Sequence, residues 1–333
     1  MKRIFFLIPI VLTIGLFICG TLFAAPVKLR ISLGVPEQHF LGEAIRGWAG
    51  MIEKNSNGEI KPELYYSAQL FRDNEVLKAV QTGAVDCGLI YTMYLQTQLV
   101  PAIKILQFPF LFNTLEETWK VMNSDVGKAW KETAEKKGVK LIATVLYPTP
   151  EGNCLMTTKP VKVPADMKNL VIRSISPENA AMIKKWGAGP SFITAAELYM
   201  AIQRGALQGA MVALPAYVER KFYEVAPNLI MLPYASIHTY IALNKSYFDR
   251  LTPAQRKVVM DASEVINKTT YDLAMKVLKR DFDEAKKSAK VYVPTAAELA
   301  QWKQGAEAIW AEDTKNDKVL TDMLVKVREI LKR

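Results

Sequence analysis

Short apolar strands alternate with amphipathic helices along the first third of the chain, and this order constrains the fold more than any other feature. Val27 to Leu33 alternates like a half-buried strand, and the apolar side chains of Phe40 to Lys54 recur at helical spacing. Two further strands are predicted over Ile60 to Tyr66 and Ala84 to Tyr91, with a helix over Asn74 to Thr82 between them. This order predicts an α/β fold with a mostly parallel sheet, in which ligands collect beyond the carboxyl ends of the strands.

One stretch of the pattern occurs twice. Residues 75–90 align without a gap on residues 197–212, with Glu, Ala, Gln, Gly and Ala shared and most other positions similar in polarity. Chance is the alternative, because any helix–Gly–strand unit favours such residues, but the two copies occupy comparable places in two β/α halves. A length of 333 residues also suits two domains. We therefore predict two similar lobes, whose strand ends near Ile90 to Tyr94 and Val212 to Pro215 face each other across a cleft.

A single long helix is predicted in the last third of the chain. Asp73 is expected to cap the helix that follows it, and Thr252 is expected to cap a much longer one with Pro253 at its first position. No Gly or Pro interrupts the helical pattern up to about Ala289, which gives a rod of roughly 54 Å. The simplest interpretation is a helix that crosses both lobes, and a break near Thr269 and Thr270 is the alternative. The expected division is a signal peptide over 1–24, a first lobe from 27–150 and about 238–270, and a second lobe from 151–237 and about 271–333.

The first residues indicate export. A basic start at 1–3 precedes an apolar run over 4–23 and the small residues Ala24 and Ala25, which are the parts of a secretory signal peptide. The apolar run is nearly long enough to span a bilayer, so an uncleaved anchor is the competing interpretation. The Pro and Gly residues inside the run favour cleavage, most simply after Ala24. The mature protein is therefore expected to be periplasmic.

Composition and motifs exclude several classes of function. Lys and Arg exceed Asp and Glu by 43 to 33, but the basic residues are spread along the chain, so nucleic acid ranks last among possible partners. The only histidines are His39 and His238, and no zinc, phosphate-loop, dinucleotide or nucleophile-elbow motif is present. We expect no catalysis, no cofactor and no metal site, with a hydrolase using a carboxylate pair as the formal alternative. Cys87 and Cys154 are expected to be buried free thiols.

Arg173 is the residue that most suggests a binding site. It ends the apolar strand that starts at Leu170 and precedes the turn Ser174 to Pro177. At the carboxyl end of a strand, a planar guanidinium can hold a carboxylate through two parallel hydrogen bonds. The structural alternative is a pairing with a carboxylate of its own lobe, such as Glu197. Position alone does not decide between the two.

At this point the sequence resembles a known family, the DctP-type substrate-binding proteins of TRAP transporters. The resemblance implies a two-lobed periplasmic binding protein fold with a ligand cleft between the lobes and a long lobe-spanning helix. It also implies a receptor that passes a small organic acid to integral-membrane permease subunits, and Arg173 falls on the family's carboxylate-binding arginine. The stretches that carry the resemblance lie in order over nearly the whole mature chain: Tyr65–Leu70, Gln107–Phe112, Lys159–Arg173, Glu197–Gln203, Lys221–Val225 and Asn244–Phe248.

The departures from the family pattern lie around the expected pocket. Many members carry a second Arg twenty positions before the first, and here that position is Asn153. The family's ligand-binding Asn corresponds to Val212, and a frequent pocket Phe corresponds to Ala195. Tyr91 and Tyr94 stand where sugar-acid-binding relatives place charged residues. The pocket is therefore expected to keep the anchor of the family but to be less polar around it.

These observations define the expected receptor. Arg173 should anchor the ligand carboxylate, and Asn153 should bond the same group or a neighbouring oxygen. The ligand is expected to be a monocarboxylate with an apolar or aromatic body, and the protein a monomer that serves a TRAP permease. An exported receptor for a sensor system is the alternative within binding proteins. The full set of expected ligand-binding residues is Arg173, Asn153, Tyr91, Tyr94, Val212, Ala195, Asp73, His39 and His238.

Overall fold

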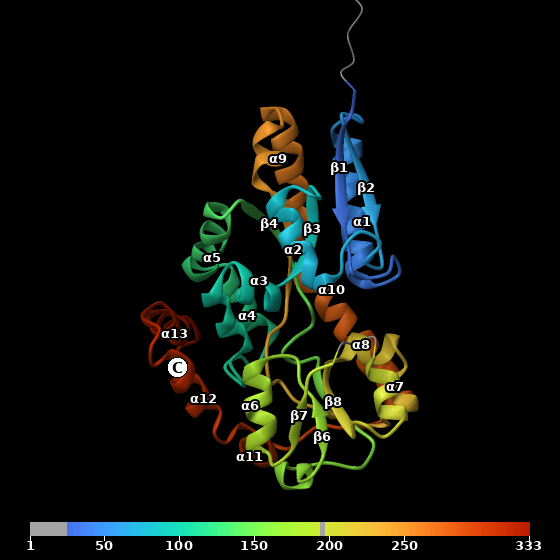
Figure 1. Ribbon diagram of the computed structural model, residues 1–333, viewed down its shortest axis with the longest axis vertical. Helices are drawn as coiled ribbons and strands as arrows, with labels where there is room; N and C mark the ends of the chain where they lie inside the picture. Colours follow the sequence, from blue (N-terminus) through green and yellow to red (C-terminus); the bar gives the residue numbers. More distant parts are fainter. Residues whose placement is uncertain (1–24, 194–196) are drawn as a thin grey trace, which may run out of the picture.

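The computed structural model describes residues 25–193 and 197–333, so the expected signal peptide and Ala195 lie outside the described residues. Two sheets divide the described chain into two lobes (Figure 1). The first lobe is built on the sheet β2-β1-β3-β10-β4, and the second lobe on the sheet β11-β9-β5-β8-β6-β7. The strands of the first sheet are β1 (Val27–Ser32), β2 (Ile60–Tyr65), β3 (Cys87–Tyr91), β4 (Val139–Val145) and β10 (Thr239–Asn244). Those of the second sheet are β5 (Asn153–Thr157), β6 (Val171–Arg173), β7 (Gly189–Ser191), β8 (Gly209–Ala213), β9 (Asn228–Met231) and β11 (Lys290–Tyr292).

The helices follow the predicted alternation and extend it into the second half of the chain. In the first half they are α1 (Phe40–Asn55), α2 (Asp73–Thr82), α3 (Thr92–Gln98), the 3-10 helix η1 (Pro101–Gln107), α4 (Leu115–Met122) and α5 (Asp125–Lys136). The middle of the chain contains η2 (Pro164–Met167), α6 (Pro177–Lys185), α7 (Leu198–Gln203), α8 (Leu214–Glu219) and η3 (Phe222–Glu224). The last part contains α9 (Lys245–Arg250), α10 (Pro253–Ser288), α11 (Ala296–Lys303), α12 (Ala306–Thr314) and α13 (Lys318–Leu331).

Each sheet contains one reversed strand, and both reversals have the same cause. β10 is antiparallel to β3 and β4, and β5 is antiparallel to β8 and β9. The chain enters each of these strands from the other lobe, so it enters the sheet at the end where the neighbouring strands finish. The remaining strand pairs of both sheets are parallel. The carboxyl ends of β3, β4, β6, β8 and β9 therefore all lie at the junction between the lobes.

Two buried segments and one helix carry the chain between the lobes. Residues 146–152 follow β4 into β5, and residues 232–238 follow β9 into β10. Thr149 ties the two segments together, because its hydroxyl donates to the Ile237 carbonyl and accepts from the Ile237 amide, each at 2.9 Å. The Leu232 amide donates to the Asn153 carbonyl at 3.0 Å. These hydrogen bonds hold the two crossing segments together where the lobes meet.

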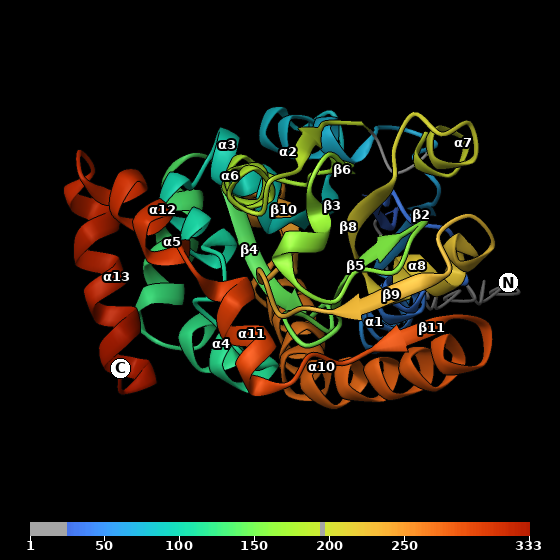
Figure 2. The same ribbon diagram turned by 90° about the horizontal axis from the view of Figure 1, so that it is seen from below.

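The long helix α10 is continuous over 36 residues, as predicted, and the alternative of a break near Thr269 and Thr270 does not occur. Thr252 caps it as predicted: the Thr252 hydroxyl accepts from the Gln255 amide, and Pro253 occupies the first helical position. It packs on α1 and β4 of the first lobe and on α8 and β11 of the second, and Figure 2 shows it running along both. The Thr270 hydroxyl accepts from the Leu146 amide at 2.7 Å, where the helix passes the first crossing segment.

The repeated stretch forms equivalent units in the two lobes. Its first copy is α2 with β3, and its second is α7 with β8. Gly83 and Gly205 hold the same place in the two copies, and both adopt the left-handed conformation, with φ of 78° and 74°. The predicted cap of α2 was wrong, because the helix begins at Asp73 and its N-cap is Arg72, whose amide donates to Glu75. The Asp73 side chain therefore does not cap α2.

The C-terminal helices contact both lobes. Helix α12 packs on α6, and α13 packs on η1, α4 and α5 (Figure 1). Among the ion pairs here, Lys104 of η1 lies 2.9 Å from the Asp313 carboxylate of α12 and 3.5 Å from that of Glu178 in α6. The residue boundaries expected for the lobes stay a prediction.

Cys87 and Cys154 are buried free thiols on different sheets, as predicted. None of the helices in the described ranges is long and apolar enough to cross a membrane.

Candidate ligand-binding site

Side chains from both lobes meet at the carboxyl ends of the strands. Tyr91 ends β3, Arg173 ends β6, and Tyr147 lies two residues beyond β4. Tyr94 in α3 and Asp73 at the start of α2 complete the first-lobe side of this junction. We call Arg173, Tyr91, Tyr94, Tyr147 and Asp73 the interlobe site.

Arg173 is mostly enclosed, and its guanidinium is held by backbone oxygen atoms. Its Nε donates to the Ile193 carbonyl and its Nη1 to the Met211 carbonyl, both at 3.3 Å. Burial lowers the pKa of Arg173, and the hydroxyls of Tyr234 and Tyr94 oppose this effect. Within the described part of the chain, no carboxylate forms an ion pair with Arg173. An enclosed guanidinium without a counter-ion of its own is suited to an anionic ligand.

The first-lobe side of the site is a row of aromatic rings. Tyr91 and Tyr94 meet edge to face with centroids 6.4 Å apart, and Tyr147 lies 6.4 Å from Tyr91. The row continues to His39, whose ring centroid is 6.1 Å from that of Tyr147. Burial raises the pKa of Tyr94, and its phenol also senses charges of both lobes, those of Asp73 and Arg173. The row thus runs from the anchor toward the start of α1.

Asp73 is a carboxylate fixed in an enclosed position. A Cβ atom at Gly34 would lie 1.6 Å from Asp73 Oδ1, so the carboxylate occupies the space that a side chain at position 34 would need. Oδ1 is buried and has no hydrogen-bond partner among the described residues. Burial raises the pKa of Asp73, and the guanidinium of Arg220 opposes this rise. The position of Asp73 at the first turn of α2 also favours a negative charge there.

His39 joins the lobes beside the site. Its Nδ1 accepts from the Leu41 amide at 3.1 Å as the N-cap of α1, and its Nε2 lies 3.4 Å from the Glu219 carboxylate of α8. Burial, with a smaller contribution from the charges of Arg220 and Arg280, lowers the pKa of His39 to about 4. Burial raises the pKa of Glu219 to about 7. A neutral His39 whose Nδ1 accepts carries its proton on Nε2, the atom that lies near the Glu219 carboxylate across the junction.

The other predicted residues are enclosed by protein. His238 is fully buried in the second crossing segment, and burial lowers its pKa to about 3. Asn153 is fully buried and its amide donates to the Ala235 carbonyl, while its Oδ1 has no partner among the described residues. Val212 packs in the hydrophobic cluster of the second lobe that also contains Cys154. The structure thus gathers Arg173, Tyr91, Tyr94, Asp73 and His39 at the junction and leaves these three within its walls.

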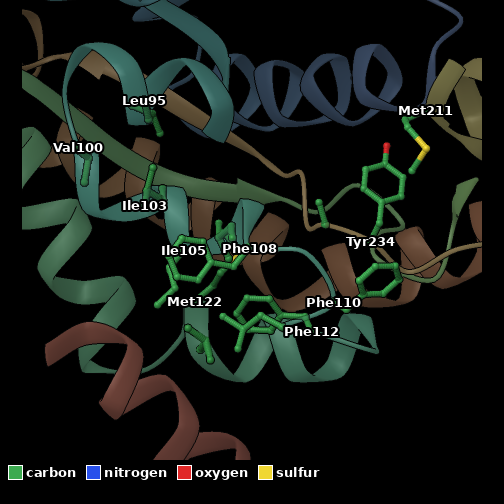
Figure 3. Packing of buried hydrophobic residues seen from close by; sticks show 14 of the residues in the cluster. Leu95, Val100, Ile103, Ile105, Phe108, Phe110, Phe112, Met122, Met211 and Tyr234 are labelled. Carbon is green, nitrogen blue, oxygen red and sulfur yellow. The ribbon is translucent and has the colours of Figure 1, made fainter. Parts of the chain in front are cut away.

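Three residues at the junction were missed by the sequence analysis. Tyr147 lies in the aromatic row, and Arg220 follows α8. Tyr234 is 1% exposed, its hydroxyl has no partner in the described ranges, and Figure 3 shows its ring beside Met211. Each lies in a crossing segment or at a helix end, where no local pattern marks a side chain as facing the junction.

The described residues hold no metal-binding cluster. No group of three or more His, Cys, Asp or Glu side chains in residues 25–193 and 197–333 is placed to hold a metal ion. Two surface hollows of about 650 and 430 Å³ lie elsewhere, on α10 around Lys279 and between η2 and α11 around Trp186, and neither is lined by Arg173.

Two α/β lobes with a lobe-spanning helix and an enclosed cation between the strand ends define the class of two-lobed solute-binding proteins. Comparison with known families gives the particular one. The family model described as "bacterial extracellular solute-binding protein, family 7", the DctP family, matches residues 31–317. The chain belongs to this family, whose members serve as receptors of TRAP transporters, so the predicted family and fold class are confirmed.

Individual relatives agree with this assignment. A solute-binding protein of Albidiferax ferrireducens is 28% identical over 298 residues, which is 87% of this chain and 85% of the relative. The 2,3-diketo-L-gulonate-binding periplasmic protein YiaO of Escherichia coli is 28% identical over 262 residues, 77% and 79% of the two chains. A Bordetella pertussis extracytoplasmic solute receptor solved as a binder of pyroglutamic acid has a TM-score of 0.83 at 19% identity and covers 91% of this chain and 99% of its own. The likeness to the solved structure shows the shared fold.

Proposed function

We propose that the protein is the periplasmic receptor of a TRAP-type transporter for a small organic acid whose carboxylate is held by Arg173. The observation that carries the proposal is the enclosed Arg173 guanidinium, bonded to two backbone carbonyls and to no carboxylate of the described chain. A ligand carboxylate would supply the missing charge and accept from the remaining N–H groups. In line with a carboxylate ligand, similar proteins are named for 2,3-diketo-L-gulonate and pyroglutamic acid, and another is described with bound succinate.

The rest of the interlobe site favours a monocarboxylate with an apolar or aromatic body. Tyr91, Tyr94 and Tyr147 present ring faces and edges beside the anchor. A second Arg at position 153 is replaced by a buried Asn, so a second carboxylate would lack that partner. A polar group buried without a partner costs ~1–3 kcal/mol. Compact dicarboxylates and heavily hydroxylated sugar acids should therefore bind weakly.

The remaining predicted residues act from the walls of the site in this proposal. The second amide hydrogen of Asn153 would serve the ligand carboxylate or a neighbouring oxygen. Val212 and His238 would shape the pocket from behind, and His39 would act through its contact with Glu219. Ala195 would line the pocket from the segment outside the described residues.

In this proposal the receptor binds and releases its ligand without converting it. We propose that the signal peptide is removed after Ala24, that the mature protein is a periplasmic monomer, and that it delivers its ligand unchanged to integral-membrane permease subunits. Delivery to a sensor is the alternative. Ligand recovered intact from the purified protein separates binding from turnover, and genes for membrane subunits beside this gene separate a permease partner from a sensor.

A thermal-shift screen of organic acids tests the function directly. A ligand present at a hundred times its Kd should stabilise the native state by about 2.7 kcal/mol. The expected hits are monocarboxylates, with binding confirmed by calorimetry and lost in Arg173→Ala. A library in which no carboxylate raises the melting temperature, while neutral or cationic solutes do, would contradict the proposal.

A further inference from the structure

Four neighbouring strands of the second sheet meet the junction beside one another, in the order β9-β5-β8-β6. Arg173 ends β6 and pairs with Ala210 of β8. Asn153 begins β5 and pairs with Ala213, the last residue of β8. The second crossing segment continues from β9, and its Leu232 amide donates to the Asn153 carbonyl at 3.0 Å. The residues just beyond Leu232 therefore lie at the same edge of the sheet as Arg173.

Tyr234 is a side chain that the second crossing segment brings to this edge. It is 1% exposed, and its hydroxyl has no hydrogen-bond partner in residues 25–193 and 197–333. Figure 3 shows its ring and hydroxyl beside Met211 of β8, whose carbonyl accepts from Arg173 Nη1 at 3.3 Å. Burial raises the pKa of Tyr234, and the charge of Arg173 opposes this rise. The phenol therefore keeps its proton at neutral pH, and its donor lies near the residue that holds the guanidinium.

Hydrogen bonds on both sides of Tyr234 fix its backbone. Its amide donates to the Leu232 carbonyl at 2.8 Å, and its carbonyl accepts from the Phe110 amide at 3.0 Å. The carbonyl of the next residue, Ala235, accepts from the side-chain amide of Asn153. Asn153 occupies the position of the second Arg that many members of the family carry, and here it supports the segment that carries a neutral phenol.

The donors at this edge call for an acceptor with several lone pairs. Arg173 uses two of its five N–H groups on the carbonyls of Ile193 and Met211, and the Tyr234 hydroxyl adds one more donor without a partner in the described ranges. A carboxylate has two oxygen atoms and about four lone-pair sites, so one carboxylate can accept from both residues. An alkyl group in its place would leave the phenol buried without a partner, which is costly.

We propose that the Tyr234 hydroxyl is the second donor to the ligand carboxylate that Arg173 holds. The inference rests on the proposed function, because it takes that carboxylate as given. Both groups are enclosed where the lobes meet, so a ligand reaches them when the lobes move apart. One guanidinium and one neutral phenol balance a single negative charge, which suits a monocarboxylate. The second crossing segment thereby supplies a ligand-binding residue where the sequence analysis expected only His238.

Tyr234→Phe tests the proposal because it removes the hydroxyl and keeps the ring. Calorimetry gives the Kd of every acid that raises the melting temperature in a screen that includes phenylacetate, pyroglutamate, D-glucuronate and succinate. Each of these acids should bind about tenfold or more weakly to Tyr234→Phe, because hydrogen bonds to charged oxygen atoms are the strong ones. The loss should be similar for all of them, since the carboxylate is the group that they share.

The stability of the ligand-free protein is the second measurement. Tyr234→Phe removes a buried hydroxyl that has no partner in the described chain, so its melting temperature should equal or exceed that of the unaltered protein. A hydroxyl that serves only the fold, for example through a buried water molecule, predicts the reverse pattern. In that case the melting temperature of Tyr234→Phe falls and the Kd of each acid is unchanged.

Tyr247→Phe is the matched control. Tyr247 is 5% exposed and its hydroxyl also lacks a partner within the described ranges, but the residue lies in α9. Strand β10 runs away from the junction, from Thr239 beside Tyr91 to Asn244 beside Val139, so α9 lies at the far end of the first lobe (Figure 1). Tyr247→Phe should therefore bind every acid as the unaltered protein does.

The outcomes separate this inference from the function on which it rests. Unchanged affinity in Tyr234→Phe, together with lost affinity in Arg173→Ala, would overturn the inference and leave the receptor function in place. A loss confined to acids with one kind of body would also overturn it, because Tyr234 would then contact the body and not the carboxylate. If no organic acid of the screen binds the unaltered protein, the receptor function itself is wrong and the inference falls with it.

Discussion

Replacing Arg173 by alanine separates a ligand-binding role from a structural one, because a binding role predicts little change in the stability of the ligand-free protein and a structural role predicts a large loss. The guanidinium donates to the carbonyls of Ile193 and Met211, and each such bond stabilises by roughly 0.5–1.5 kcal/mol. The same side chain is a buried cation without a carboxylate in the described chain, and burying a charge is costly. The two effects offset each other, so Arg173→Ala should change the melting temperature of the ligand-free protein little.

Ligand affinity should respond much more strongly. Truncating one partner of an enclosed charge pair costs roughly 2–5 kcal/mol, which is about a thirtyfold to several-thousandfold loss of affinity. Arg173→Lys should recover only part of it, because an ammonium keeps the charge but cannot form two parallel hydrogen bonds. The measurement pairs a calorimetric Kd for the ligand found in the screen with the melting temperature of each ligand-free variant. A folded Arg173→Ala protein that binds at near-normal affinity would remove Arg173 from the site, and a large fall in melting temperature with proportionate loss of binding would make its role structural.

Three further predictions follow from the junction. Saturating ligand should reduce the radius of gyration in small-angle scattering, because two lobes joined by narrow crossings close by hinge bending; an unchanged radius with confirmed binding would refute hinge closure. Thr149→Val should lower the free energy of unfolding by about 1–3 kcal/mol in denaturant titrations, because it removes both bonds to Ile237, whereas Thr158→Val at an intermediate, weakly bonded position should cost less. His238 should make the free energy of unfolding fall as the pH drops from about 6.5 toward 3, because its pKa is about 3 in the folded protein and the unfolded chain therefore binds the proton first. Glu219 acts in the opposite sense, because its pKa in the folded protein is raised to about 7. The test is therefore a comparison with His238→Gln, whose melting temperature should fall less steeply on acidification than that of the unaltered protein.

Local sequence patterns predicted those parts of the structure that local physics decides. The N-cap and unbroken phase of α10 follow from Thr252, Pro253 and the absence of helix breakers, and the equivalence of Gly83 and Gly205 follows from a conformation that glycine adopts without strain. The position of Arg173 at a strand end also follows from a local pattern, the short apolar run that precedes it. The expected cap at Asp73 failed because the Arg72 backbone and Glu75 took that role one residue earlier.

The contacts across the junction between the lobes could not be predicted from local sequence patterns. Tyr91 and Tyr147 approach each other only because the first crossing segment brings residue 147 beside the end of β3, and no spacing in the sequence encodes that geometry. The reversed directions of β5 and β10 likewise depend on where the chain re-enters each sheet. The repeated stretch and the resemblance to the family both predicted two lobes, but at positions 91, 94, 153 and 212 this chain departs from the family, so the surroundings of Arg173 had to come from the structure.

The place of β10 in the first sheet has a consequence for how the protein is made. This strand is inserted between β3 and β4, yet it is synthesised almost a hundred residues after β4. A nascent chain that has emerged only through residue 150 therefore lacks the strand that pairs with both β3 and β4, and one edge of each of these two strands has no partner. Such long-range pairing delays folding, and slow folding would keep the chain unfolded for the export that we propose. Splitting the protein after residue 150 should accordingly yield two fragments that are insoluble alone and regain structure only when they are refolded together.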